Sequence, residues 1–401
     1  MQKTLILIFL PVLSGILLTL LLLKPLVITA EAEESRIEKE TYDTNETEGV
    51  YLEEEAEEYI DIAEIEESLK ELTGNSGFSF WDTVKGFLTG AIPLNLDELL
   101  AVVSAIFLNE MKRQKLLAIQ ILLVALASAV FSNFVHVFES HQISNISFYM
   151  MYLMISTLLM SSFSSLTELV SETCGALNTF MKILLPSYVI TIVLSAGSVT
   201  ALGFYEIMIL AIGLLQTVII KCILPAIHFY MVVLLLNQLS DEDFFSKLAQ
   251  LLETAISWGI KSMLGIVVGL QAVQCLVTPA VDSLKNSALT RVASVIPGIG
   301  SVLNAAAETV AGSAVVIKNA VGAAGIFALG MICLTPFIKL AVCILLFRGI
   351  CTVIQPICEK RMVEGIESIS RGTVLLLRVM TSSLAIFVIS LALITASVKG
   401  G

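Results

Sequence analysis

Two charged side chains of this 401-residue chain lie deep inside apolar stretches, where they could take part in chemistry. Apolar residues flank Glu206 and Lys339 for about half the length of a membrane-spanning helix on each side. A charge at the centre of a bilayer costs about 2.5–3.5 kcal/mol on insertion scales, so each side chain needs a partner or an aqueous lining. Structural pairing is the simpler interpretation of both, and coupling to ion or proton movement is the alternative.

Signatures of the common enzyme classes are missing from the sequence. It has no GxxxxGK[ST] phosphate loop, no HExxH and no GxSxG. Asp241, Asp243 and Asp282 fall in predicted loops, so no aspartate pair is predicted inside the membrane. The three histidines have no metal-ligand spacing, and the seven cysteines form no CxxC pair. We therefore expect no enzymatic activity, no catalytic residues, no cofactor and no metal site.

The most distinctive stretch of the chain runs from Arg291 to Gly325, where 17 of 35 residues are Ala, Gly or Ser. Pro and Gly break the chain at 297–300, and a weakly hydrophobic helix with one polar face is predicted to follow. Small side chains let membrane helices pack closely, so this helix suits a pore lining or a contact between subunits. An amphipathic loop on the membrane surface is the alternative. The candidates for packing or pore lining are Arg291, Pro297, Gly298, Gly300, Asn304, Glu308, Lys318, Asn319 and Gly322.

The composition requires a membrane as the solvent for most of the chain. Hydrophobic residues make up 56% of the sequence and charged residues 14%, and the mean hydropathy is +0.90. A single apolar segment in lipid can satisfy its backbone polar groups only as a helix. We therefore predict an all-α polytopic integral membrane protein with an N-terminal signal peptide, an acidic extracytoplasmic segment and seven or eight transmembrane helices.

Negative charge is concentrated near the amino terminus. Residues 31–75 hold 18 Asp and Glu against 3 Lys and Arg, while the rest of the chain holds 17 acidic and 20 basic residues. This balance provides no basic surface large enough to predict binding of DNA or RNA.

The amino-terminal segments are predicted to be exported. Residues 1–30 are typical of a signal peptide, because Lys3 precedes a long apolar run that ends in small residues; an uncleaved anchor is the alternative. Residues 31–84 then form the acidic extracytoplasmic segment. Apolar residues at helical spacing between 62 and 72 could form a short docking helix, but such dense charge favours a solvated, mostly disordered spacer.

The remaining chain divides into a membrane body and its flanks. Residues 85–115 are predicted to contain an amphipathic, interfacial helix at 92–110 followed by a basic flank. Membrane helices follow at 116–277, then the small-residue-rich amphipathic segment at 278–325, then the C-terminal membrane helices at 326–401. Windows long enough to approach a span are 116–138, 148–166, 181–199, 203–220, 222–239, 257–277, 326–347 and 374–396.

The excess of Lys and Arg in cytoplasmic loops gives two orientations that disagree. The basic loop 348–373 is predicted to be cytoplasmic. Counting eight spans back from this loop places the basic flank at 112–115 outside the cell. An exported amino terminus requires that placement, whereas the positive charge of the flank predicts a cytoplasmic one. Either residues 92–110 also cross the membrane, or residues 203–239 form one re-entrant element instead of two spans.

The order of these segments resembles the stage III sporulation protein AE family of endospore-forming bacteria, over essentially the whole chain. The most specific part of the resemblance is R-x-A-S-x-I-P followed by Gly, and then IKNAVG. These residues are Arg291, Ala293, Ser294, Ile296, Pro297, Gly300 and Ile317 to Gly322. The extended Glu-rich stretch near the amino terminus departs from the family's usual pattern.

The resemblance implies a role in endospore development. Members of the family reach the mother-cell membrane that surrounds the forespore. There they belong to a channel or secretion-like complex with a secretion-type ATPase, other membrane subunits, ring-forming subunits and a forespore partner protein, and this complex supports late forespore gene expression. The resemblance supplies no catalytic residue. We expect a multi-pass membrane subunit that is not an enzyme and that could also contact copies of itself.

Two other functions fit the residues. A secondary transporter or permease of a small solute would use Glu206 and Lys339 as coupling charges, although no convincing internal repeat is present. A passive scaffold would instead recruit soluble partners through the Glu-rich segment.

Overall fold

The computed structural model describes residues 62–73, 79–88, 96–136, 141–196, 200–239, 243–293 and 300–397. Within these ranges the chain is helical apart from short turns, and no strand is present. The helices are α3 (Ile62–Thr73), α4 (Phe80–Leu88), α5 (Leu96–His136), α6 (His141–Ala196), α7 (Thr200–Val218), the π-helical turn η1 (Ile219–Ile223), α8 (Leu224–Leu239), α9 (Ser246–Ala293), α10 (Gly300–Ile354) and α11 (Lys360–Ser397). The prediction of an all-α chain is confirmed.

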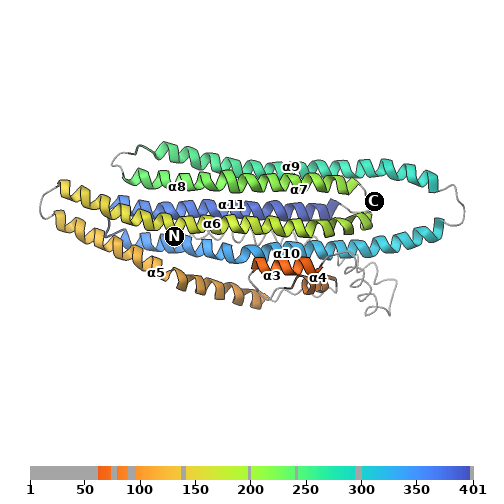
Figure 1. Ribbon diagram of the computed structural model, residues 1–401, viewed down its shortest axis with the longest axis horizontal. Helices are drawn as coiled ribbons and strands as arrows, with labels where there is room; N and C mark the ends of the chain where they lie inside the picture. The colour runs from red at the N-terminus through yellow and green to blue at the C-terminus, as the bar shows by residue number, and fades with distance from the viewer. Residues whose placement is uncertain are drawn as a thin grey trace.

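The long helices lie side by side along one axis and alternate in direction (Figure 1). The end of α5, the start of α6, the end of α8, the start of α9 and the α10 to α11 turn lie toward one end of the bundle (Figure 1). The end of α6, the start of α7, the end of α9, the start of α10 and the end of α11 lie toward the other (Figure 1). Fully buried aromatic side chains from α6, α10 and α11 pack between these helices, namely Phe163, Tyr188, Phe347 and Phe387.

Six described helices are long and apolar enough to cross a membrane. They are Leu100–Phe131, Phe148–Thr191, Ile207–Leu239, Ser246–Gln274, Ser313–Ile354 and Lys360–Ala392. The predicted count of seven or eight spans is not confirmed.

Several apolar windows that look separate in the sequence belong to one helix. The windows at 148–166 and 181–199 both fall largely in α6, because the residues between them contain no Pro that would break the helix. Residues 200–239 form one continuous helical rod through the π-helical turn. The predicted interfacial helix at 92–110 is likewise the first part of α5, and the basic flank is inside α5.

The basic flank at 112–115, which gave one of the two orientations, does not lie in a loop. The α10 to α11 turn lies toward one end of the bundle, whereas the start of α5 lies near the middle of the bundle's length (Figure 1).

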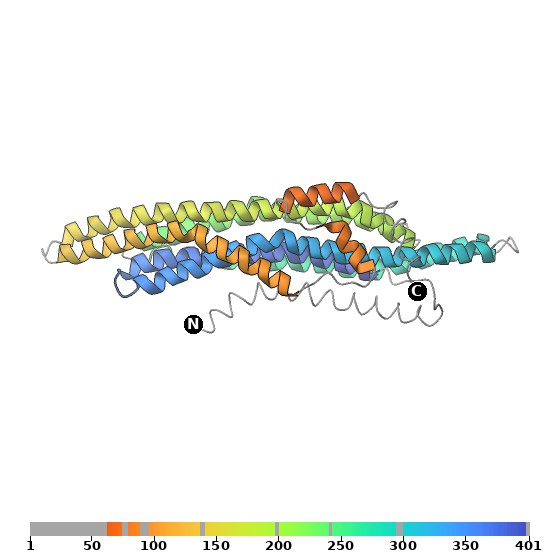
Figure 2. The same cartoon turned by 90° about the horizontal axis from the view of Figure 1, so that it is seen from below.

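Residues 62–73 are wrongly predicted as a solvated spacer. They form α3, which packs against α4, α6 and α10, and Ile65 and Leu69 are fully buried (Figure 2). The apolar face offsets the dense charge, because the carboxylates lie mainly on the outer face of the helix. The proposed signal at 1–30 and residues 31–61 lie outside the described residues.

The small-residue run is divided between two helices. Its first residues end α9, and residues 300–325 begin α10. From Ala314 to Ile326 most side chains of α10 are buried among neighbouring helices.

Candidate functional site

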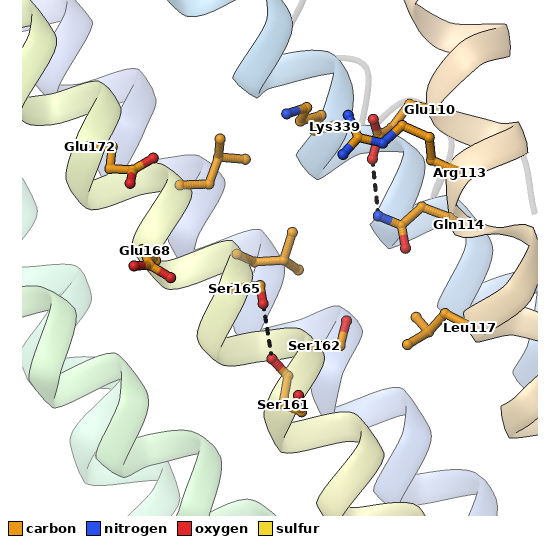
Figure 3. Close-up of a pocket in the computed structure, with 12 residues that line it drawn as sticks. Glu110, Arg113, Gln114, Leu117, Ser161, Ser162, Ser165, Glu168, Glu172 and Lys339 are labelled. Atoms are coloured by element: carbon orange, nitrogen blue, oxygen red, sulfur yellow. Dashed lines mark hydrogen bonds between the residues drawn. The ribbon is translucent and has the colours of Figure 1, made fainter.

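A polar pocket lies between α5, α6 and α10, with a cavity volume of about 420 Å³ (Figure 3). Apolar side chains are the more usual lining between the helices of a membrane bundle. The polar residues that line it are Glu110, Arg113, Gln114, Ser161, Ser162, Ser165, Glu168, Glu172 and Lys339. Three carboxylates therefore share one cavity with two cations.

The α5 side of the pocket is built on two residues one helical turn apart. Gln114 donates a hydrogen bond from Nε2 to Glu110 Oε1 at 3.0 Å, as the i, i+4 spacing allows. Glu110 is only 6% exposed, whereas Arg113 is exposed at the pocket's rim. A carboxylate this buried is stable in its charged form only with donors or a cation nearby.

The α6 side of the pocket is a polar stripe. Ser161, Ser165, Glu168 and Glu172 follow one another at spacings of four, three and four residues, which places them along one helical face. Ser165 donates its hydroxyl to the Ser161 carbonyl at 3.3 Å, so it is satisfied within the helix. The two glutamates are exposed.

Lys339 enters the pocket from α10, three residues after Pro336. Its side chain is half-buried, and it gathers with Glu110 and Arg113 across from Glu168 and Glu172 (Figure 3). The bundle thus gives this predicted intramembrane lysine an acidic, polar surrounding. Such a cavity can hold water, or the charged end of a small or extended ligand.

The other predicted candidates do not meet in this pocket. Lys318, Asn319 and Gly322 lie farther along α10, where Lys318 is buried with 2% exposure. Pro297 and Gly298 lie outside the described residues. For a further group the helix is described but the side chains are not: Glu206, Arg291, Gly300, Asn304 and Glu308.

Glu110, Glu168 and Glu172 were missed by reasoning from the sequence. Glu110 falls in the predicted interfacial helix, and both α6 glutamates fall between two predicted spans, so none of the three was assigned to a span. The regular spacing of polar residues from Ser161 to Glu172 is the signal that could have found one wall of the pocket.

Metal coordination has no support in the part of the chain that the structure describes. There, no group of three His, Cys, Asp or Glu side chains is arranged to hold a metal ion.

Comparison with known proteins identifies the family of this chain. The family model described as stage III sporulation protein AE matches residues 78–398, which include α5 to α11 and every residue of the pocket. The stage III sporulation protein AE of Bacillus subtilis (strain 168) is 22% identical over 362 residues, which cover 84% of this chain and 90% of that protein. No solved structure matches the chain. The chain belongs to the stage III sporulation protein AE family.

Proposed function

We propose that this protein is a multi-pass membrane subunit of a channel, or secretion-like complex, that joins the mother cell to the forespore. It acts in the mother-cell membrane around the forespore and is required for endospore development and late forespore gene expression. The observation that carries this proposal is the family match over residues 78–398, which spans the whole helical bundle. Six helices suited to a bilayer agree with a membrane subunit.

A role without catalysis is supported by the chemistry of the pocket. A hydrolase or transferase of this type would need a nucleophile hydrogen-bonded to a base. Ser165 instead donates to a backbone carbonyl, and Glu110 accepts from Gln114. We propose that the pocket provides a hydrated polar region in the bundle, which serves packing against other subunits or passage through the complex.

The proposed partners are a secretion-type ATPase, other membrane subunits, ring-forming subunits, a forespore protein and further copies of this chain. None is a nucleic acid. The lipid bilayer surrounds the assembly.

Deleting the gene in the spore-forming host tests this proposal. The deletion strain is expected to complete engulfment but to lose refractile, heat-resistant spores and late forespore gene expression, and the wild-type gene supplied at another locus should restore both. Normal refractile spores with undiminished late forespore expression would rule the proposal out.

Transport of a small solute by this protein alone is the second candidate. Its specific support is that Lys339 shares a polar cavity with Glu110, as coupled charges in a transporter would. Purified protein in liposomes separates the two functions. Solute flux without any partner, abolished by Glu110→Gln or by Glu206→Gln, would favour the transporter over the complex subunit.

A further inference from the structure

The long helices of this protein are too long for a single bilayer. The 56 residues of α6 span about 84 Å at 1.5 Å per residue. The hydrocarbon core is about 30 Å thick, and even a tilt of about 40° lets a helix use only about 39 Å of its length. More than half of α6 therefore lies outside hydrocarbon, whichever part crosses.

Each of the six long helices carries a charged residue at one common level, which we call the polar belt. The polar belt consists of Arg113 on α5, Glu168 on α6, Lys221 in η1, Lys261 on α9, Lys339 on α10 and Arg378 on α11. All are exposed except Lys339, which is half-buried. Five of the six are cations.

A shared pocket establishes the common level for α5, α6 and α10. Arg113, Glu168 and Lys339 line the same pocket (Figure 3). They are therefore neighbours across three helices.

Two further contacts align α6 with α11. A Cβ placed on Gly372 would lie 2.8 Å from the Phe163 ring, and Ser383 is hydrogen-bonded to Gln216, which also bonds the Cys174 carbonyl. Arg378 lies midway between 372 and 383, just as Glu168 lies midway between 163 and 174. Both are therefore at one level.

The same reasoning places the lysines of η1 and α9. The His228 and Phe163 rings are 6.1 Å apart, and Gln216 bonds the Cys174 carbonyl. Lys221 lies near the midpoint between 216 and 228, so it is level with Glu168, which lies midway between 163 and 174. A Cβ on Gly259 would lie 3.1 Å from Ile223 Cδ1, which sets Lys261 beside Lys221.

Long uncharged stretches extend from the polar belt in one direction on α5 and α6, and in the other direction on α9 and α11. On one side, residues 116–136 of α5 and 141–167 of α6 carry no Asp, Glu, Lys or Arg. On the other side the same is true of residues 262–281 of α9 and 379–397 of α11. Each stretch approaches or exceeds the roughly 20 residues that a spanning helix needs.

Trp258 marks the same level from the outside of α9. It lies one turn before Lys261, and its side chain is 73% exposed. Tryptophan and lysine side chains concentrate where hydrocarbon meets the headgroups, because each has an apolar body and a polar tip.

We infer that the polar belt lies at one surface of the bilayer, where its cations bind the phosphate headgroups of anionic lipids. The six helices then cross hydrocarbon on one side of the belt only, and their other halves stand outside the lipid. This inference does not depend on the proposed role in sporulation.

Trp258 provides the probe for the test, because Trp81→Phe leaves it as the single tryptophan of the full chain. The purified protein is reconstituted into bilayers of phosphatidylglycerol and phosphatidylcholine whose acyl chains carry bromine either near the headgroup or near the bilayer centre. Bromine quenches nearby indole fluorescence, and we expect the shallow bromine to quench Trp258 more strongly. Stronger quenching by the deep bromine, or none by either, would overturn the inference.

Two introduced tryptophans test whether only one half crosses. In a background without native tryptophan, Leu123→Trp on α5 and Leu210→Trp on α7 each place an indole on an exposed position. They lie ten and eleven residues from the belt on opposite sides, about 15–17 Å along the helix. Lipid with bromine near the bilayer centre should quench one of these two indoles and leave the other unquenched. Strong quenching of both, or of neither, would contradict the inference.

Headgroup binding is tested with brominated phosphatidylglycerol as a minor component in unlabelled phosphatidylcholine. Wild-type belt cations should enrich this anionic lipid near Trp258, and Lys221→Gln with Lys261→Gln should lower the quenching. Lys360→Gln, on a side chain 87% exposed far from the belt, is the matched control and should leave quenching unchanged. Equal quenching in all variants would exclude headgroup binding by these lysines.

Discussion

Gly325 of α10 lies so close to Leu184 of α6 that a methyl group on its Cα would come within 2.7 Å of Leu184 Cδ2. Leu391 of α11 closes the other side at 2.8 Å from the same position. Three helices therefore meet at a point where any Cβ would displace two buried leucine side chains.

Gly325→Val is expected to destabilise the bundle. Its extra carbons must push Leu184 and Leu391 out of their packed positions, and overpacking of this kind typically costs about 1–3 kcal/mol. Gly330→Val on the same helix is the matched control, because a Cβ there has nothing within 4 Å. Thermal unfolding of the purified proteins in detergent compares them, and equal losses in both variants would contradict close packing at Gly325.

Gln216→Leu is expected to weaken the joint between α6, α7 and α11. Gln216 is 2% exposed and donates from Nε2 to the Cys174 carbonyl at 2.8 Å and to Ser383 Oγ at 2.9 Å. Leucine fills similar space but leaves the Ser383 hydroxyl without this partner, at a cost of about 1–3 kcal/mol. Thr217→Val, which removes only an exposed bond within the helix, should be close to neutral. A double-mutant cycle with Ser383→Ala measures the coupling, and strictly additive losses would show that the pair does not interact.

Glu110→Gln and Lys339→Gln are expected to lower the yield of heat-resistant spores toward that of a deletion strain. Glu110 is buried and Lys339 is half-buried in the pocket between α5, α6 and α10, so each substitution leaves the other, poorly solvated charge without this counter-charge. The double variant should recover part of the loss, since both of these charges are then removed. Lys360→Gln is the control outside the pocket. Immunoblots of membranes must show equal protein levels, and full spore yield in both single variants would remove the pocket from the function.

Glu66→Ala is expected to release α3 and α4 from the bundle. One carboxylate oxygen of Glu66 accepts hydrogen bonds from the Ser79 hydroxyl at 2.7 Å and from the Trp81 backbone N–H at 3.0 Å. Ser79 in turn caps α4 through the Asp82 N–H at 3.1 Å. Loss of these charge-assisted bonds, worth about 1–3 kcal/mol, should speed limited proteolysis between residues 62 and 88. Glu67→Ala alters an exposed neighbour and should leave the cleavage rate unchanged. Faster cleavage of Glu67→Ala than of Glu66→Ala would contradict this role of Glu66.

The helical character of the chain could be predicted because it follows from composition alone. An excess of apolar residues requires lipid, and lipid requires helices. The apolar face of α3 was also visible in the spacing of Ile65 and Leu69, but its docking was not. Whether a charged segment docks depends on a matching surface, here formed by α4, α6 and α10, and on the contacts of Glu66.

The positions of helix ends could not be predicted from apolar windows. A hydropathy window measures suitability for lipid, whereas a helix continues as long as its backbone can form hydrogen bonds. The 56 residues of α6 pass through Ser165 to Glu172 without a break, so two windows became one helix. The same continuity hid one wall of the pocket, because Glu168 and Glu172 lay between the two windows.

Lys339 could be found from its apolar flanks, whereas its surroundings could not. Glu110 lies more than 200 residues earlier in the chain, and only the packing of α5 against α10 brings the two into one cavity. A pairing across that distance leaves no pattern in a single sequence.

Isolation of the assembled protein from sporulating cells tests the central claim most directly. An affinity-tagged chain that restores sporulation is cross-linked in mother-cell membranes, purified, and compared by quantitative mass spectrometry with the same strain lacking the tag. We predict selective enrichment of the secretion-type ATPase, the ring-forming subunits and the forespore partner of the stage III complex, in constant proportion to the tagged chain. Recovery of the tagged, functional chain alone would contradict membership of a mother-cell to forespore complex.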